Sequence, residues 1–298
     1  RACKANLTPI HSLFNDDHEK IYGIYSGFMN NEPDQVTIDS NKNIHRTWII
    51  DDENAISSIV EEFAPKSLFI ADGHHRYETA LAYKREMEQS ASYDPQAPYN
   101  YVMMYLTSMS HPGLTILPAH RMVKGLDNFY TAELLAALAP YFDVEELPCS
   151  AENFSGDAEK FISAIGEYSE LGGCFGLVTN GQNCFRLLKL KDFDAAGNVM
   201  DQSIPATLKR LDVTILREVI MTLGLRIDPG NSEGKIEYSP IIMEAIEKAL
   251  RGDVQASFIL NPTRVDQMRE AAEKGYKMPQ KSTYFYPKLS SGMVLNVF

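Results

Sequence analysis

Residues 67–90 read SLFIADGHHRYETALAYKREMEQS and combine a strand, a tight turn and a helix in one stretch. The apolar run at 68–71 predicts a buried strand, and Asp72 and Gly73 break it. Strong helix formers follow, so the His-His-Arg residues at 74–76 are expected in the first turn of a helix. The apolar stripe of that helix is expected to consist of Tyr77, Ala80, Leu81 and Met87.

The first turn of a helix offers unpaired N–H groups and a partial positive charge. His74, His75 and Arg76 add cationic side chains to that end, which is unfavourable unless an anion is held there. Asp72 is suited to capping the helix, and Gly73 allows the tight backbone that lets a ligand approach closely. The turn is therefore predicted to bind phosphate, with Arg76 as a bidentate partner.

One pair of side chains and one further histidine in this helix are candidates for moving a proton. His74 and Glu78 are four residues apart and share a helix face, as a histidine–carboxylate pair for general acid–base chemistry requires, and His75 is a further candidate. A purely structural interpretation stays open, in which Asp72 only caps, His75 packs and Arg76 pairs with a surface acid. His74 and Glu78 supply two ligands, fewer than zinc takes from a protein, so no metal site is predicted.

A second His-Arg pair, His120 and Arg121, follows the apolar strand expected at 114–118. Strand ends commonly carry ligand residues in proteins that mix strands and helices, so both residues are candidate phosphate ligands. The alternative is a strand-terminal arginine that lies in solvent. Two His-Arg pairs, each expected at a strand exit, favour a shared anionic site.

The third candidate is the segment Lys281, Ser282 and Thr283 near the end of the chain. It offers one cation and two hydroxyls to a phosphate. It is not a Walker A loop, because the preceding glycine pattern is missing. The alternative is a basic, aromatic loop that packs its tyrosines and phenylalanine against the body of the protein.

The composition limits the classes of protein that fit. A formal net charge of −12 argues against direct nucleic-acid binding. There is no apolar run of about 20 residues and no signal segment, so no membrane partner is expected. The four cysteines show no C-x-x-C spacing, so we expect them to be reduced, in a cytoplasmic protein.

The order of predicted elements favours an α+β fold with mixed strands and helices, divided into residues 1–125, which carry the D-G-H-H-R turn, and an α/β portion at 126–298. Further strands are expected at 7–14, 43–51, 99–109, 173–178, 183–190 and 254–260. Further helices are expected at 53–63, 131–140, 157–171, 208–223, 240–250 and 263–274. Polar connections are expected at 90–98 and 189–197, and a turn at 228–231.

The run IADGHHRYETAL at 70–81 resembles the signature of a bacterial and archaeal family, domain of unknown function 1015 (DUF1015). The resemblance continues in NLTPI, ILPAHR, LNPT and MPQKSTYFYPK, at 6–10, 116–121, 260–263 and 278–288. Members of the family are longer at the front. The resemblance therefore implies that this chain lacks an N-terminal segment, which agrees with a first residue that is Arg rather than Met.

The D-G-H-H-R turn is also similar to the nucleotide-phosphate motif of the ParB/sulfiredoxin superfamily, which includes partition proteins, sulfiredoxin and kinases of free serine. That similarity implies a mixed sheet with helices and a nucleotide phosphate at residues 73–76. Sulfiredoxin-like members carry a reactive cysteine in this turn, where this chain has His74 or its neighbour. Reductase chemistry is therefore not expected.

These resemblances imply a nucleotide-binding protein that acts as a small-molecule, free amino acid-like phosphotransferase. The nucleotide would be ATP, ADP or CTP with Mg²⁺, and the second partner is an unidentified small molecule. Arg76 and Arg121 would neutralise phosphate charge, His75 or the His74–Glu78 pair would move the proton, and Lys281 would complete the pocket. The alternative is a non-catalytic regulatory module related to partition proteins, and formation of a homodimer is left open.

Overall fold

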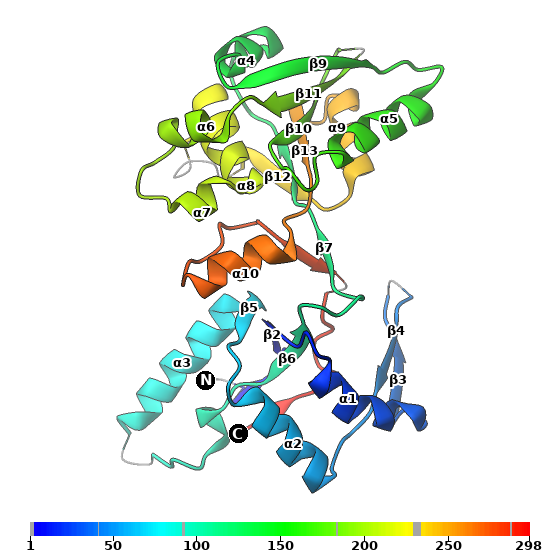
Figure 1. The fold of residues 1–298 in the computed structure, drawn as a ribbon. Helices are drawn as coiled ribbons and strands as arrows, with labels where there is room; N and C mark the ends of the chain where they lie inside the picture. The colour runs from blue at the N-terminus through cyan, green and yellow to red at the C-terminus, as the bar shows by residue number, and fades with distance from the viewer. Residues whose placement is uncertain (1–2, 41, 91–92, 183, 229–233, 287) are drawn as a thin grey trace. The chain divides into compact units, whose positions relative to one another are not determined.

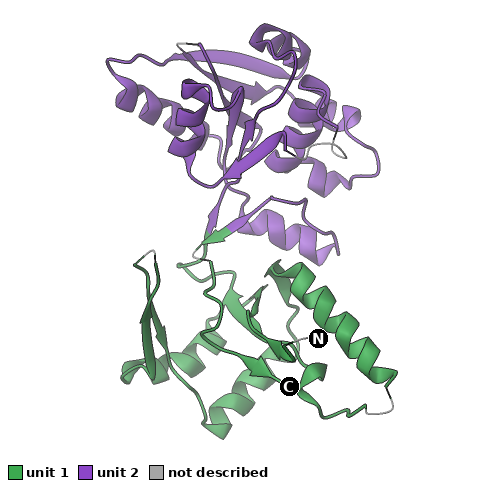
Figure 2. Ribbon diagram, turned by 180° about the vertical axis from the view of Figure 1, so that it is seen from behind, with its two compact units in different colours: residues 1–115, 285–298 green, residues 116–284 purple. Residues whose placement is uncertain are grey.

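The computed structural model describes residues 3–40, 42–90, 93–182, 184–228, 234–286 and 288–298, and its fold is of the predicted α+β class (Figure 1). The chain forms two compact units (Figure 2). Unit 1 comprises residues 1–115 and 285–298, and unit 2 comprises residues 116–284. The sequence prediction placed its boundary after residue 125 and did not assign the last residues to the first part. Within the described residues, no helix is long and apolar enough to cross a membrane.

Unit 1 is built on a three-stranded mixed sheet in the order β5-β2-β6. Its strands are β2 (Ile10–Phe14), β5 (Phe69–Asp72) and β6 (Met104–Ser108). The central strand β2 runs antiparallel to β5 and parallel to β6, and all its residues are buried. The other elements of unit 1 are β1 (Ala5–Asn6), α1 (Lys20–Ser26), η1 (Gly27–Asn30), β3 (Gln35–Ile38), β4 (Ile44–Thr47), α2 (Glu53–Phe63), α3 (His74–Glu88), η2 (Pro98–Asn100) and β15 (Asn296–Val297).

The elements predicted around the opening motif are present in unit 1. The helix predicted at 53–63 is α2, whose N-cap Asp52 accepts a hydrogen bond from the Ala55 amide at 2.7 Å. The strand predicted at 99–109 is shorter, because the 3₁₀ turn η2 takes its first residues. In α3, the predicted stripe is half-buried at Ala80, Leu81 and Met87, whereas Tyr77 is exposed.

Unit 2 is built on a six-stranded antiparallel sheet in the order β12-β8-β13-β10-β11-β9. Its strands are β8 (His120–Val123), β9 (Phe142–Pro148), β10 (Cys174–Thr179), β11 (Cys184–Leu190), β12 (Ile236–Ser239) and β13 (Ala256–Leu260). Its helices are α4 (Thr131–Leu138), α5 (Phe154–Gly166), α6 (Phe193–Val199), α7 (Ala206–Lys209), α8 (Asp212–Ile215), the π-helix η3 (Leu216–Gly224), α9 (Ile242–Arg251) and α10 (Val265–Glu273). The boundaries with unit 1 fall within β7 (Thr115–Leu117) and β14 (Tyr284–Tyr286).

Buried side chains form one hydrophobic core on each face of this sheet. Phe175 and Leu177 of β10 belong to the core that α4, α6, α8, η3 and α10 cover, and Cys174 and Val178 belong to the core that α5 and α9 cover. This alternation is the period of two that a strand imposes when both faces are buried. Gly176 lets α5 approach closely, because a Cβ there would lie 2.4 Å from the Phe161 ring.

The structure corrects several sequence predictions in unit 2. The polar connection predicted at 189–197 contains the end of β11 and helix α6, because the Asp192 carboxylate caps that helix at the Asp194 amide (2.7 Å) and Phe193 packs against the core. Residues 216–224 form a π-helix rather than part of one α-helix. The turn predicted at 228–231 lies largely outside the described residues.

Three strands of the sheet in unit 2 were not predicted at all, namely β9, β8 and β12. β9 is an edge strand on which Phe142 is the one buried residue, so its sequence lacks a clear apolar alternation. Its carboxylates pair instead with β11, Glu145 with Lys189 at 2.6 Å and Glu146 with Arg186 at 2.9 Å. The second, β8, holds His120 and Arg121, which are therefore inside a strand and not at a strand exit.

Candidate functional site

The turn between β5 and α3 has the tight backbone that the sequence predicts. β5 ends at Asp72, α3 begins at His74, and Gly73 between them has a φ of 98°. This left-handed conformation suits glycine, because a side chain there is strained. Gly73 is itself the N-cap, and no side chain caps the helix. The prediction that Asp72 caps the helix is therefore wrong, since Asp72 lies one position before the cap.

Arg76 folds back over this turn. Its Nη2 donates to the Asp72 carboxylate at 2.7 Å, and its Nη1 donates to the carbonyl of Pro9. A Cβ at Gly73 would lie 2.8 Å from that Nη2, so the guanidinium lies directly against the glycine. The structural interpretation, in which Arg76 pairs with an acid, thus describes this state of the protein, although 35% of the side chain stays exposed.

A third charged group, Lys288, joins the turn from the far end of the chain. Its Nζ lies 3.7 Å from the Asp72 carboxylate, and both side chains are 46% exposed. Asp72 is therefore held between two cations, Arg76 and Lys288. We call Asp72, Gly73, Arg76 and Lys288 the turn cluster. The sequence analysis quoted Lys288 in the tail but did not place it at the turn, because the two positions are 216 residues apart.

The two histidines of the turn point into solvent. His74 is exposed, and the His75 side chain is 99% exposed. The Nδ1 of His75 lies 3.6 Å from the Glu78 carboxylate, so Glu78 pairs with the histidine three residues before it. The sequence prediction paired Glu78 with His74, the other neighbour that a helix allows.

A histidine that the sequence analysis missed lies beside the turn cluster. His11 of β2 pairs in register with Asp72 of β5 and with Tyr105 of β6. It is 6% exposed, and its Nε2 lies 3.0 Å from the Thr107 hydroxyl. Burial lowers the pKa of His11, Asp72 opposes that change, and Lys288 and Arg76 add to it. The available signal was a polar residue in the middle of the buried strand IHSLF.

Two of the predicted residues in unit 2 have structural partners. His120 is 2% exposed, and its Nδ1 accepts from the Leu260 amide at 3.4 Å. Burial, assisted by Arg121, lowers the pKa of His120 to about 4, so its ring is neutral near pH 7. Ser282 is 3% exposed; its hydroxyl donates to the carbonyl of Pro279, and its own carbonyl accepts from Thr263 at 2.9 Å. The neighbouring Thr283 is half-buried.

Arg121 and Lys281 of unit 2 lie together. Arg121 is 5% exposed and donates to the carbonyl of Ala119 at 2.7 Å and to that of Lys281 at 3.3 Å. Its guanidinium carbon lies 5.5 Å from the centre of the Tyr238 ring, and the Lys281 ammonium lies 5.8 Å from the same centre. Burial lowers the pKa of Arg121 to about 10. The predicted site residues are thus divided between the turn in unit 1 and this cluster in unit 2.

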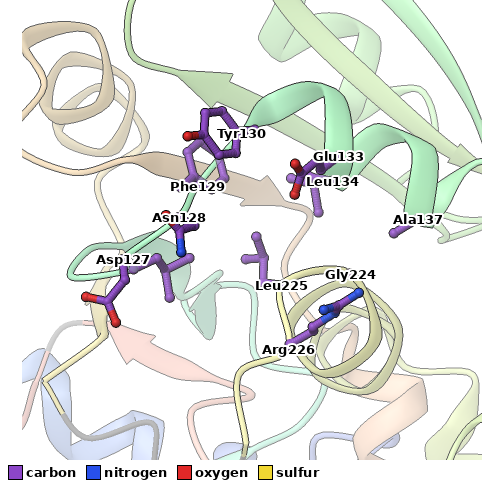
Figure 3. Close-up of a pocket in the computed structure, with 11 residues that line it drawn as sticks. Asp127, Asn128, Phe129, Tyr130, Glu133, Leu134, Ala137, Gly224, Leu225 and Arg226 are labelled. Atoms are coloured by element: carbon purple, nitrogen blue, oxygen red, sulfur yellow. The ribbon is translucent and has the colours of Figure 1, made fainter.

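Unit 2 also contains a hollow of about 530 Å³ between the start of α4 and the end of η3 (Figure 3). It is lined by residues 126–130 and 224–226 and by Glu133, Leu134 and Ala137. None of the predicted site residues lines it. Among the residues that the structure describes, no three His, Cys, Asp or Glu side chains are grouped as metal ligands.

Comparison with solved structures gives distant matches. A conserved hypothetical protein from Pyrococcus furiosus is 11% identical, with 97% of this chain and 81% of that chain covered and a TM-score of 0.41. A mutant of free serine kinase in complex with ADP is 14% identical, with 92% and 83% covered and a TM-score of 0.39. Free serine kinase in complex with AMP is 14% identical, with 93% and 83% covered and a TM-score of 0.38. Similarity at this level carries no argument about activity. No curated protein matches the chain.

The fold and the turn cluster together define a two-unit α+β protein in which helix α3 begins without a side-chain cap and the preceding Asp72 pairs with two cations. The family model for proteins of unknown function named DUF1015 matches residues 1–214. The chain therefore belongs to the DUF1015 family, as its motifs indicate.

Proposed function

We propose that unit 1 binds the phosphate group of a nucleotide at the turn between β5 and α3. The observation that carries this proposal is the left-handed Gly73, which begins a 15-residue helix without any side-chain cap. The first amides of α3 therefore lack a side-chain acceptor at the end of the helix where the dipole favours an anion. Helix starts of this kind bind phosphate in many proteins.

The charged side chains around the turn support the same conclusion. Arg76 and Lys288 supply two positive charges against the single negative charge of Asp72. A phosphate carries more charge than a carboxylate and more acceptor oxygens, so it would compete with Asp72 for both cations. Arg76 can turn its planar fork to a phosphate and bind it with two hydrogen bonds.

The chemistry that we propose at this site is transfer of a phosphoryl group from a nucleotide, ATP, ADP or CTP, to a small molecule. Such catalysis consists mostly of positioning and of stabilising charge, and Mg²⁺ would arrive bound to the nucleotide phosphates. The His75–Glu78 pair is the candidate for moving the proton, because the carboxylate orients the imidazole.

The exposure of this pair favours a second candidate function, a nucleotide-binding module without catalysis. His75 is almost fully in solvent, whereas catalytic acids and bases usually lie in a shielded environment that tunes them. The two candidates share the phosphate site and differ in turnover. A transfer assay with labelled nucleotide separates them, since the second function predicts binding without any transfer or release of phosphate.

Isothermal titration with ATP, ADP and CTP tests the shared site. We expect Arg76→Gln to weaken binding about tenfold, the loss typical of one charge-assisted hydrogen bond. Arg85→Gln is the matched control, because Arg85 lies in the last turn of the same helix. No heat from any of the three nucleotides at millimolar concentration, or equal losses in the two variants, would contradict the proposal.

A further inference from the structure

Arg121 in unit 2 is a buried cation that pairs with no carboxylate of the described residues. Its side chain is 5% exposed and contacts two backbone carbonyls and the face of Tyr238. Among the described residues, no carboxylate forms an ion pair with it. Burial of an unpaired charge is costly, so proteins usually place an acid or a bound anion near it.

A second cation, Lys281, lies at the same ring. The Lys281 ammonium lies 5.8 Å from the Tyr238 ring centre, and within the described part of the chain it forms no hydrogen bond or ion pair. The Tyr238 side chain is 42% exposed, and its hydroxyl likewise has no hydrogen-bond partner there. Arg121, Lys281 and Tyr238 thus bring two positive charges and several donors together without an acceptor side chain.

Two acids of this region, Glu237 and Glu218, pair with other cations. Glu237 precedes Tyr238 on β12, so its side chain points to the opposite face of the sheet, where it binds Lys124 and Lys248. A further cation, Arg217, is near enough to lower the pKa of Arg121, and it pairs with its own neighbour Glu218 at 2.7 Å. The positive potential at Tyr238 is therefore not cancelled by these carboxylates.

The backbone that carries Lys281 is held in place. Lys281 has a φ of 58°, a left-handed conformation that lysine rarely adopts. Its carbonyl accepts from Arg121 at 3.3 Å, and the Ser282 carbonyl accepts from Thr263 at 2.9 Å. A strained residue persists only where surrounding contacts determine it, and such residues concentrate at ligand sites.

We propose that Arg121, Lys281 and Tyr238 form a second anion site, in unit 2, for a phosphate group. The Lys281 ammonium and the Tyr238 hydroxyl would bind the oxygens directly, and Arg121 would supply charge from beneath the surface. The group would be free phosphate or the phosphate of a monoester. This site uses none of the residues proposed for the nucleotide site in unit 1.

Calorimetric titration with inorganic phosphate at low ionic strength tests this site in an Arg76→Gln background, where the turn cluster is weakened. We expect Lys281→Gln in that background to weaken phosphate binding about tenfold and Tyr238→Phe, which keeps the ring, about threefold. Lys160→Gln is the control, since Lys160 is an exposed lysine of α5 in the same unit. A parallel titration with AMP separates the two sources, because a monoester site binds AMP more tightly than free phosphate.

The phosphate site in unit 2 and the nucleotide site in unit 1 are contradicted by different results. If Arg76→Gln abolishes all phosphate binding, or if Lys281→Gln binds phosphate as the Lys160→Gln control does, there is no second site in unit 2. If the wild-type protein binds no nucleotide while phosphate binding still depends on Lys281, the proposed nucleotide site in unit 1 is contradicted and the phosphate site in unit 2 is supported. Thermal melting checks that Lys281→Gln and Tyr238→Phe remain folded.

Discussion

The turn cluster of unit 1 and the cluster of Arg121, Lys281 and Tyr238 in unit 2 each include the arginine of a His-Arg dipeptide, yet the two arginines differ in their surroundings. Arg76 is 35% exposed and pairs with Asp72, whereas Arg121 is 5% exposed and is bound by carbonyl groups and an aromatic ring. The histidines differ as well, since His75 is in solvent and His120 is buried. The same dipeptide therefore has different chemistry at the start of a helix and inside a strand.

The largest effect that we expect comes from truncating each arginine. Arg121→Ala removes a buried side chain and leaves two carbonyls without their donor, so we expect the free energy of unfolding to fall by about 4 kcal/mol. Arg76→Ala removes a part-exposed ion pair and should cost about 1 kcal/mol. Urea denaturation of both variants measures the difference, and equal losses would show that the two environments are energetically alike.

The histidines should differ in how they link stability to pH. Because burial lowers the pKa of His120 from 6.5 to about 4, the unfolded chain takes up a proton in that interval that the folded protein does not. The stability from His120 is fully present above pH 6.5 and falls by about 3 kcal/mol as the pH drops to 4. The lowered pKa of His11 acts in the same direction.

Denaturation between pH 7 and 4 measures this dependence. His120→Gln should flatten the decrease in stability, and His75→Gln, at an exposed position, should leave it unchanged. A decrease of the same size in the His120→Gln variant would show that other groups are responsible for it.

Gly73→Ala should disturb the turn cluster through the backbone. The added Cβ meets the Arg76 guanidinium at 2.8 Å, and the φ of 98° is strained for alanine, so we expect a loss of about 1–2 kcal/mol. Gly23→Ala is a matched control in helix α1, where a Cβ meets nothing within 4 Å. That substitution should stabilise the protein by about 0.5–1 kcal/mol. Thermal melting that moves in the same direction for both variants would refute this explanation.

The smallest effect should come from Lys288. Its ion pair with Asp72 is 3.7 Å long and half-exposed, so Lys288→Gln should change the free energy of unfolding by about 0.5 kcal/mol or less. Its contribution should decline further with added salt, because exposed pairs are screened. A loss above about 2 kcal/mol in urea denaturation would show that Lys288 has a structural role larger than one surface pair has.

The local sequence was sufficient to predict a strand, turn or helix where the residues of that segment themselves favour the structure. The strand, glycine turn and helix around Gly73 were predictable from residues 67–90 alone, and helix α2 was predictable from residues 53–63. The sequence could not reveal whether Glu78 pairs with His74 or with His75, because residues three and four positions away are both within reach on a helix.

The surroundings of Asp72 depend on contacts between distant positions. His11 and Lys288 approach Asp72 only after the sheet of unit 1 and the returning C-terminal segment have assembled. The strand β8 was missed because its polar residues resemble a strand exit, although all four are buried. Burial of His120 and Arg121 is a property of the six-stranded sheet and not of the dipeptide.

The two segments of unit 1 are separated in the chain by the whole of unit 2. Residues near the end close it, since Val297 pairs with Ala5 and the Phe298 amide donates to the Lys4 carbonyl. During synthesis, the ribosome therefore releases every residue of unit 2 before unit 1 has its last strand. The synthesis of unit 2 therefore separates the first 115 residues of unit 1 in time from β15, the strand that pairs with β1.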